Sequence, residues 1–158
     1  MDIHFSAGAK TGANHVPLTP ISHLNRAAAV HGPRTAVAYG DVRYSYSTFA
    51  ERIRCVAGAL QQMGIGKGDT VSVLCPNIPE LYELHYAVPM IGAVLNTINT
   101  RLEPETVGYI FGHGDAKLVI ADSAFSDLVD AAFEVLGNSL PVVWVCDAQG
   151  PCPEKTFD

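Results

Sequence analysis

Short apolar runs alternate with segments of helical periodicity through the second half of the chain. Each run is four or five residues long, and the segment after it repeats its apolar positions every three or four residues. The predicted strands are Val71–Cys75, Val94–Ile98, Leu118–Ala121 and Val142–Cys146, and the predicted helices are about Ile78–Ile91, Pro104–Phe111 and Ser123–Leu136. Strands that are apolar throughout and alternate with helices indicate an α/β fold, with a mostly parallel sheet covered by helices on both faces.

The first half of the chain has a different pattern, which predicts a helix and then a β-hairpin. Thr19 is expected to cap a helix over residues 20–31, which has a proline at its first position. Gly40-Asp41 then separates two short apolar segments, Ala36–Tyr39 and Val42–Tyr44. A two-residue loop of this composition is typical of a tight hairpin.

The clearest amphipathic helix follows the hairpin, and Ser45 is expected to cap it. Its apolar stripe is Phe49, Ile53, Val56, Leu60 and Met63, whereas Glu51, Arg52, Gln61 and Gln62 are expected to point elsewhere. We expect one α/β unit over residues 17–147. A polar, mobile lead over residues 1–16 precedes it, and the proline-containing residues 148–158 are expected to form a linker or a truncated edge.

Composition and charge narrow the class of protein. Hydrophobic residues make up 48% of the 158 positions and charged residues 16%, as in a globular domain with apolar surface left for a partner. The net charge is −6 and the ten Lys and Arg residues are scattered, so we expect no nucleic-acid partner. No run approaches the roughly 20 apolar residues of a membrane-spanning helix. The first 16 residues lack a secretory apolar core, and the expected location is cytoplasmic.

Four cysteines are present, at positions 55, 75, 146 and 152, and none forms a Cys-x-x-Cys pair. Two of them fall inside apolar runs, where a free thiol packs like a small hydrophobic side chain. We expect buried structural cysteines rather than a metal or redox centre.

The glycine-rich segment Gly64–Asp69 contains Lys67 and superficially resembles a phosphate-binding loop. Phosphate loops run from a strand into a helix, so that backbone N–H groups and the helix dipole meet the anion. This segment runs from a helix into a strand. We therefore expect Gly64 to end the preceding helix in a left-handed conformation and the rest to form a turn.

Polar residues follow three of the predicted strands, at the edge where open parallel sheets bind ligands. Asn77 follows the first strand and Asp122-Ser123 follows the third. They could contact a ligand or metal, but short polar side chains also cap helices, and capping is the expected role. Asp147 follows the last strand and could serve as a phospho-acceptor or magnesium ligand only if other acids converge on it.

Two histidines could carry chemistry. His85 falls on the apolar side of its predicted helix, four positions before Pro89, which is expected to bend that helix. We expect His85 to be a core histidine with one hydrogen bond rather than a catalytic base. His113 lies between two glycines and is expected in an exposed turn.

The second strand of the parallel set ends in polar residues that need hydrogen-bond partners: Asn96, Thr97, Asn99 and Arg101. We expect them to anchor the following loop, with ligand contact as the alternative. No acid pair, nucleophile with its base, metal cluster or phosphate loop can be assembled from the remaining residues. The sequence thus predicts no catalytic, cofactor-binding or metal-binding residue in this chain.

Several segments nevertheless resemble, in order and spacing, the beginning of an AMP-forming acyl-CoA synthetase of the adenylate-forming ligase superfamily. They are Pro17–Pro20, Thr35–Asp41, Tyr44–Tyr46, Gly64–Val71 and Val71–Leu102, and the resemblance extends to about Asp147. The segment His85–Asn96 is similar in sequence to the fatty-acyl and medium-chain acid branch of this superfamily. A local departure is Glu103 where relatives place a Ser or Thr cap, which weakens that cap but suits the helix dipole.

The resemblance implies a two-step ligase. A carboxylic acid, such as a fatty acid, attacks ATP in the presence of Mg²⁺ to give an acyl-adenylate, and coenzyme A then displaces AMP. The family's Ser/Thr/Gly-rich loop ending in Pro-Lys-Gly, its ATP-binding aromatic, Glu and Asp motifs and its C-terminal lysine have no counterpart here, since the lysines are Lys10, Lys67, Lys117 and Lys155. No catalytic residue is transferred, and the chain alone is expected to be inactive and to bind no cofactor tightly.

The same resemblance implies that the remainder of a ligase chain supplies further strands and helices. Without it, an unpaired sheet edge and apolar surface are expected to be exposed, with marginal stability or self-association, including a homodimer. Two alternatives stay open. One is a non-catalytic binding or dimerisation module derived from the ligase subdomain, and the other is an unrelated doubly wound nucleotide-binding domain.

Overall fold

The protein is described by a computed structural model, which covers residues 18–146. Five α-helices and a 3-10 helix occur in this part: α1 (Pro20–His31), α2 (Tyr46–Gln62), α3 (Pro79–Met90), α4 (Pro104–His113), η1 (Ser123–Phe125) and α5 (Ser126–Leu136). The strands are β1 (Thr35–Tyr39), β2 (Val42–Ser45), β3 (Thr70–Leu74), β4 (Val94–Thr97), β5 (Ala116–Asp122) and β6 (Val142–Val145). The order of elements follows the sequence pattern closely.

Four strands form a parallel sheet in the order β4-β3-β5-β6. The chain moves outward from β3 to β4 and then returns past β3 to β5, so the connections leave the sheet in opposite directions. This arrangement confirms the predicted α/β class. Strand β4 is an edge strand, and Val94 on it is 51% exposed.

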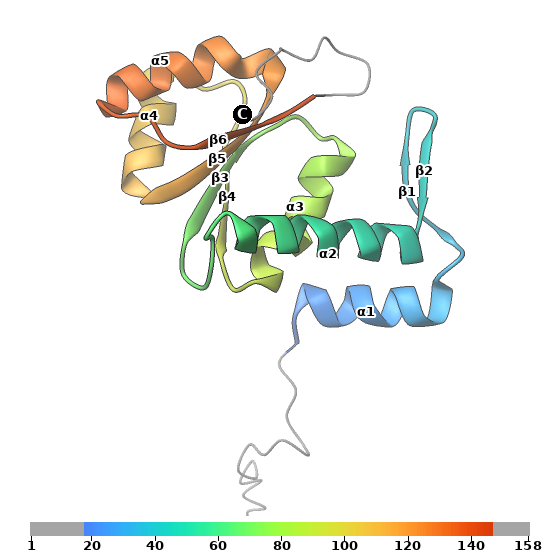
Figure 1. The fold of residues 1–158 in the computed structure, drawn as a ribbon. Helices are drawn as coiled ribbons and strands as arrows, with labels where there is room; N and C mark the ends of the chain where they lie inside the picture. Colours follow the sequence, from blue (N-terminus) through green and yellow to red (C-terminus); the bar gives the residue numbers. More distant parts are fainter. Residues whose placement is uncertain (1–17, 147–158) are drawn as a thin grey trace, which may run out of the picture.

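Helices cover both faces of the sheet, as Figure 1 shows. One face carries Val71, Val73 and Leu118 and packs in a core cluster with Leu84 and Val88 of α3. The other face carries Leu74, Val119 and Ala121 and packs with α4 and α5 residues. Alternate strand residues thus point to opposite faces, and both sets are apolar because both faces are covered.

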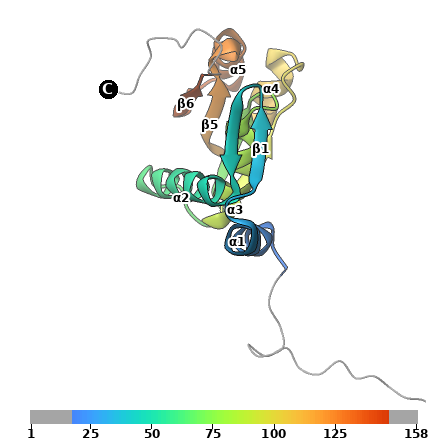
Figure 2. The same cartoon turned by 90° about the vertical axis from the view of Figure 1, so that its right-hand side faces the viewer.

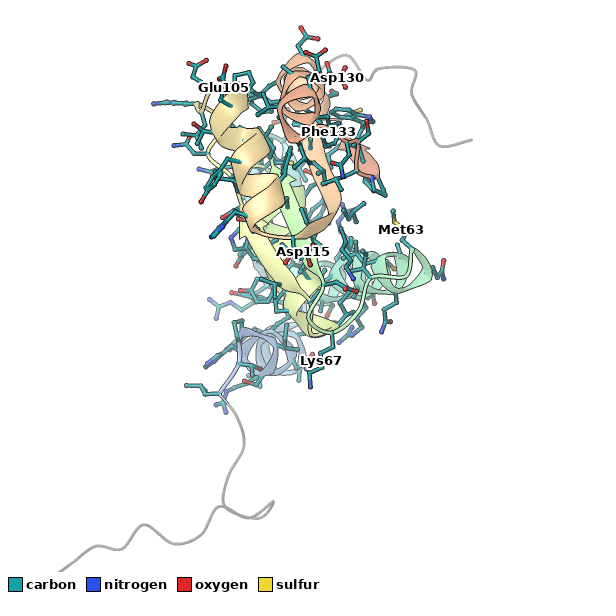
Figure 3. All side chains as sticks on the ribbon, turned by 90° about the vertical axis from the view of Figure 1, so that its left-hand side faces the viewer. Met63, Lys67, Glu105, Asp115, Asp130 and Phe133 are labelled. Atoms are coloured by element: carbon teal, nitrogen blue, oxygen red, sulfur yellow. The ribbon has the colours of Figure 1, made fainter. Side chains whose placement is uncertain are left out.

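Helices α4 and α5 approach each other closely at a glycine. A Cβ built on Gly108 would lie 2.7 Å from the Ala132 carbonyl oxygen and 3.1 Å from Val135 Cβ. Phe111 and Phe133 pack against each other next to this crossing, with ring centroids 5.7 Å apart. Figure 3 shows the two helices side by side, with Phe133 labelled on α5. The missing side chain at Gly108 therefore allows the two backbones to meet.

The β-hairpin and two helices form the amino-terminal layer. Figures 1 and 2 show the hairpin rising from the N-terminal end of α2, in the direction away from α1. Gly40 adopts a φ of 51° in the predicted two-residue loop. The hydroxyl groups of Thr19 and Ser45 accept the predicted capping bonds at the starts of α1 and α2. Val37 joins the hairpin to the cluster formed by Phe49 and Ile53 of α2.

Several detailed predictions are wrong. Met63 is 42% exposed because α2 ends at Gln62 and the chain turns away from the core. Cys55 is also exposed, since it lies on the outer side of α2, whereas Cys75 is buried as expected. Cys146 is disulfide-bonded rather than a free thiol. Strand β5 is longer than predicted, and the segment predicted as one helix from Ser123 is divided into η1 and α5.

The expected mobile lead, the linker, Cys152 and Asp147 lie outside residues 18–146. Within that range, no helix has the length and apolar character needed to cross a lipid bilayer.

Candidate functional site

The clearest concave surface with polar groups lies at the carboxyl ends of β3 and β4. A cleft of about 550 Å³ opens there. It is lined by Val73, Cys75, Pro76, Asn77, Leu81, His85, Thr97, Ile98, Asn99 and Thr100. Carboxyl ends of parallel strands are the usual ligand-binding edge of such sheets. We call this surface the strand-end cleft.

A second cleft, of about 300 Å³, lies between the β-hairpin and α3. Its lining is mainly apolar and aromatic: Val37, Ala38, Tyr39, Asn77, Ile78, Pro79, Leu81, Tyr82 and His85. We call it the hairpin cleft. Three residues, Asn77, Leu81 and His85, line both clefts, so these residues form the boundary between an apolar and a polar space.

His85 is exposed in this boundary, and the prediction that it is a core histidine is wrong. Helix α3 packs against the sheet through Leu84 and Val88 and contacts α2 on the side of Ala87. Two partners on adjacent sides shift the buried arc of the helix away from position 85. The expected single hydrogen bond is present, because Nδ1 lies 2.8 Å from the Leu81 carbonyl oxygen.

Asn77 does not cap α3, contrary to the prediction. The N-cap position belongs to Ile78, which has no side-chain capping bond, and Pro79 begins the helix without needing a hydrogen-bond acceptor for its nitrogen. The side chain of Asn77 is therefore not used for capping and lines both clefts.

Asp122 behaves as predicted, since its Oδ1 accepts a hydrogen bond from the Ala124 N–H at 2.9 Å and caps η1. Ser123 lies inside η1 and is not the cap. Asp122 is 4% exposed, and within residues 18–146 its Oδ2 atom has no hydrogen-bond partner. Burial, with Asp122 nearby, raises the pKa of Cys75 to about 12. Cys75 is consequently a neutral thiol at the back of the strand-end cleft, and its chemistry is that of a packing residue.

Two of the four polar residues predicted to anchor the loop after β4 make side-chain hydrogen bonds. Asn96 donates from Nδ2 to Ser72 Oγ at 3.1 Å, which ties β4 to β3. Asn99 Oδ1 accepts from the Arg101 N–H at 3.0 Å and holds the turn that follows. Thr97 and Asn99 also line the strand-end cleft, so ligand contact is available to them in addition to anchoring.

The glycine-rich segment is a turn, as predicted. Gly64 and Gly68 have φ values of 83° and 88°, which are left-handed conformations. Asp69 Oδ2 accepts from the Gly66 N–H at 2.8 Å, and Asp69 Oδ1 lies 2.8 Å from Lys117 Nζ. The ion pair with Lys117 and the bond from Gly66 lower the pKa of Asp69. Asp69 occupies the Gly66 N–H, and the N–H groups of Gly68 and Asp69 donate to the carbonyl oxygens of Gly92 and Gly66, so these N–H groups are not free to cradle a phosphate.

Two remaining predictions concern α4. His113 is exposed, as expected, but it is the last residue of the helix rather than part of a turn, and its ring stacks on Tyr109 at 5.3 Å. Glu103 makes no side-chain capping bond, in agreement with a weak cap.

One ionic feature was missed entirely. Glu83 on α3 is 2% exposed and forms a bidentate pair with Arg52 on α2, including an Nη2–Oε2 distance of 3.3 Å. Burial raises the pKa of Glu83, and Arg52 opposes that rise. The Arg52 guanidinium also lies 4.6 Å from the centre of the Tyr44 ring. Because both carboxylate oxygens are occupied by Arg52, Glu83 joins two helices and is not available to a substrate.

The two clefts offer hydrogen-bonding groups and apolar surface but little reactive chemistry. Their linings contain no Lys, Arg, Asp or Glu. In the part of the chain that the structure describes, no group of three or more His, Cys, Asp or Glu side chains could hold a metal ion. The two clefts therefore offer apolar surface and uncharged hydrogen-bonding groups to a small molecule, and no charged Lys, Arg, Asp or Glu side chain.

Comparison with protein families gives a match to the AMP-binding enzyme family over residues 24–155. The chain is 46% identical over 127 residues to a peroxisomal trans-cinnamate:CoA ligase of Petunia hybrida, covering 80% of this chain and 22% of that protein. It is 40% identical over 154 residues to an acetate–CoA ligase of Humulus lupulus, covering 94% of this chain and 27% of that protein. The chain thus spans about a quarter of the length of these relatives.

Solved structures agree with this match. A putative long-chain-fatty-acid CoA ligase from Rhodopseudomonas palustris is similar with a TM-score of 0.72 and 31% identity, over 81% of this chain and 33% of that one. A benzoate CoA ligase from Burkholderia xenovorans gives a TM-score of 0.70 and 26% identity, over 77% of this chain and 25% of that one.

Proposed function

The chain belongs to the AMP-binding enzyme family, and from this premise we propose that it is the N-terminal part of an ATP-dependent acid–CoA ligase. In this proposal residues 17–147 form the first α/β subdomain. The whole protein joins a carboxylic acid to AMP and then transfers the acyl group to coenzyme A. The family match over residues 24–155 carries the proposal. It also overturns the alternative of an unrelated nucleotide-binding domain, and no observation favours a non-catalytic module.

The described residues do not fit ATP, Mg²⁺ or coenzyme A. A triphosphate needs cationic side chains or a loop of free N–H groups, and neither cleft is lined by Lys or Arg. The glycine-rich segment Gly64–Asp69 has its Gly66 N–H bonded to Asp69. We therefore assign no catalytic step to this chain and propose that the remainder of the ligase supplies the reactive groups.

We propose a fatty or other carboxylic acid as the substrate of the whole protein. The relatives support a range of acids, since they are described as ligases for trans-cinnamate, 2-methylpropanoate, acetate and benzoate. The similarity of residues 85–96 to the fatty-acyl and medium-chain branch favours an aliphatic acid. Initial rates of acyl-CoA formation by the whole protein, measured with butyrate, octanoate, benzoate and cinnamate, test this choice. Preference for the aromatic acids contradicts it.

The sequence of the gene beyond Asp158 tests the proposed ligase most cheaply. An in-frame continuation with a Ser/Thr/Gly-rich loop ending in Pro-Lys-Gly is the expected result. A stop codon followed by unrelated sequence contradicts the proposal and favours the non-catalytic module.

Two further proposals concern partners and compartment. The exposed edge at β4, with Val94 51% exposed, is expected to be covered by later ligase chain or, in the 158-residue chain, by a second copy. Sedimentation of the 158-residue chain and of the whole ligase tests this, because only the 158-residue chain is expected to self-associate.

We also propose a cytoplasmic location. The cinnamate ligase is described as peroxisomal, so microscopy of the tagged whole protein against a peroxisomal marker decides between them.

A further inference from the structure

We propose that the hairpin cleft binds a small, uncharged aromatic molecule that carries a hydroxyl group. The ring would lie against Tyr39 and Tyr82, and the hydroxyl group would donate a hydrogen bond to His85 Nε2. This proposal does not depend on the ligase function, because it follows from the lining of one cleft.

The cleft has the size and lining of a small-molecule site. Its volume of about 300 Å³ is at the lower end of the range of about 300–1,000 Å³ for ligand pockets, so it suits a molecule of one or two rings. Apolar side chains make up most of its lining, with Val37 and Ala38 from the hairpin and Ile78 and Leu81 from the α3 side. Only Asn77, His85 and the tyrosine hydroxyl groups add polar atoms, which is the pattern of a mostly apolar pocket with a few orienting groups.

The aromatic wall is held in place before any ligand binds. The Tyr82 ring stacks on Phe49 with centroids 4.8 Å apart and meets Tyr86 edge-on at 5.5 Å. Phe49 is 1% exposed and cannot move without disturbing the core. Tyr82 is 43% exposed, so a fixed ring borders the cleft while part of its surface remains uncovered. A rigid aromatic surface binds a flat ring with little loss of side-chain entropy.

His85 determines which polar group the ligand must bring. The partner of Nδ1 is the Leu81 carbonyl oxygen, which can only accept, so Nδ1 carries the proton of this bond. In the neutral ring, Nε2 then has a free lone pair and accepts a hydrogen bond. A ligand therefore needs a donor at this position.

The absence of charged side chains from the lining of the clefts determines which kind of hydrogen-bond donor the ligand can carry. Neither the hairpin cleft nor the adjoining strand-end cleft is lined by Lys, Arg, Asp or Glu. A carboxylate or phosphate would lose its hydration without a cation to replace it, and an ammonium group would lack an anion. A hydroxyl group meets both requirements, because it is uncharged and donates to Nε2. Its own oxygen can accept from the Asn77 amide on the same boundary.

Binding of 2-naphthol and 2-methoxynaphthalene to the 158-residue chain tests the proposal. The two molecules share a ring system, and only the first can donate a hydrogen bond. We expect 2-naphthol to shift the NMR signals of His85 and the Asn77 amide saturably. We also expect it to bind about three- to ten-fold more tightly than the methoxy compound, as one net hydrogen bond allows.

His85→Phe is expected to remove this preference by weakening 2-naphthol to the level of the methoxy compound. His113→Phe, the same change at another exposed helical histidine, is expected to leave both affinities unchanged. Spectra of both variants show directly whether they retain the fold. Absence of saturable shifts, equal affinity of the two compounds, or a preference that persists in folded His85→Phe overturns the proposal.

Discussion

The two helix pairs that cover the sheet are held together by opposite means. Helices α4 and α5 meet at Gly108, where there is no room for a side chain, and their contact is steric and apolar. Helices α2 and α3 are joined by the Arg52–Glu83 pair and by the Phe49, Tyr82 and Tyr86 rings. The first pair closes its face of the sheet, whereas α3 of the second pair contributes residues to both the strand-end cleft and the hairpin cleft. The helix that lines both of these clefts is thus one that is held in place partly by a polar contact, the Arg52–Glu83 pair.

The largest expected effect is loss of one partner of the ionic pair. Arg52→Met leaves the carboxylate of Glu83 buried without its counter-ion. We expect a loss of about 2–3 kcal/mol in the free energy of unfolding, measured by urea denaturation. This is at or below the range of about 3–5 for fully buried pairs, because the Arg52 side chain is 39% exposed and partly screened.

The double variant Arg52→Met, Glu83→Leu is the control for that experiment. Removing both charges leaves no unpaired group, so most of the lost stability is expected to return. If Arg52→Met costs less than about 0.5 kcal/mol, the Arg52–Glu83 pair behaves like an exposed salt bridge. The contact between α2 and α3 would then not depend on a buried ionic pair.

An intermediate effect is expected at the other helix pair. Gly108→Ala places a Cβ 2.7 Å from the Ala132 carbonyl oxygen, which is backbone and cannot move away cheaply. Overpacking costs about 1–3 kcal/mol, and part is offset by the better helix propensity of alanine. We expect a net loss of about 1–2 kcal/mol in thermal or urea unfolding.

Gly58 of α2 provides the matched substitution. A Cβ there has no neighbour within 4 Å, so Gly58→Ala is expected to stabilise the protein by about 0.5–1 kcal/mol. If Gly108→Ala and Gly58→Ala change the free energy of unfolding in the same direction, the packing of α4 against α5 does not depend on the close approach at Gly108.

The smallest expected effect is the pH dependence of the stability loss caused by Arg52→Met. Burial raises the pKa of Glu83 in the folded protein, so the folded form binds this proton more readily than the unfolded chain. Stability from this group is therefore present at low pH and declines as pH rises from the ordinary carboxyl pKa to the raised one. Loss of Arg52 raises that pKa further.

It follows that the cost of Arg52→Met should be greatest near about pH 7 and shrink as the pH falls to about 5, where protonation removes the unpaired charge. Urea denaturation of both proteins across this range measures the difference. If the stability loss caused by Arg52→Met does not change with pH, the loss does not come from an unpaired Glu83 carboxylate.

The α4–α5 side was predictable from sequence because its packing obeys apolar periodicity. Leu128, Val129 and Phe133 recur at helical spacing and all contribute to the core on that side. The α2–α3 side was not predictable in the same way. Glu83 has the polarity of a surface residue, and only the position of Arg52 on another helix makes its burial tolerable.

The same reason explains the errors at the clefts. The apolar neighbours of His85 predict a core position, but α3 packs against two partners, which leaves that position exposed. The short polar side chain of Asn77 predicts a cap, but Ile78 holds the N-cap position, and Pro79 in the first turn makes a side-chain cap less necessary. Predictions from apolar periodicity and capping preferences fail where tertiary contacts determine which side of a helix is buried. Asp122 and Asn96 agree with their predictions because their partners are local or on the adjacent strand.

Acid-dependent exchange between ATP and pyrophosphate is the most direct measurement of the central claim, that this chain is the first part of an acid–CoA ligase without its reactive groups. The assay compares the 158-residue chain with the same chain extended by its genomic continuation. We predict no exchange above background for the short chain and clear exchange, dependent on acid and Mg²⁺, for the extended one. Exchange by the short chain alone, or its absence from a folded extended chain, would contradict the claim.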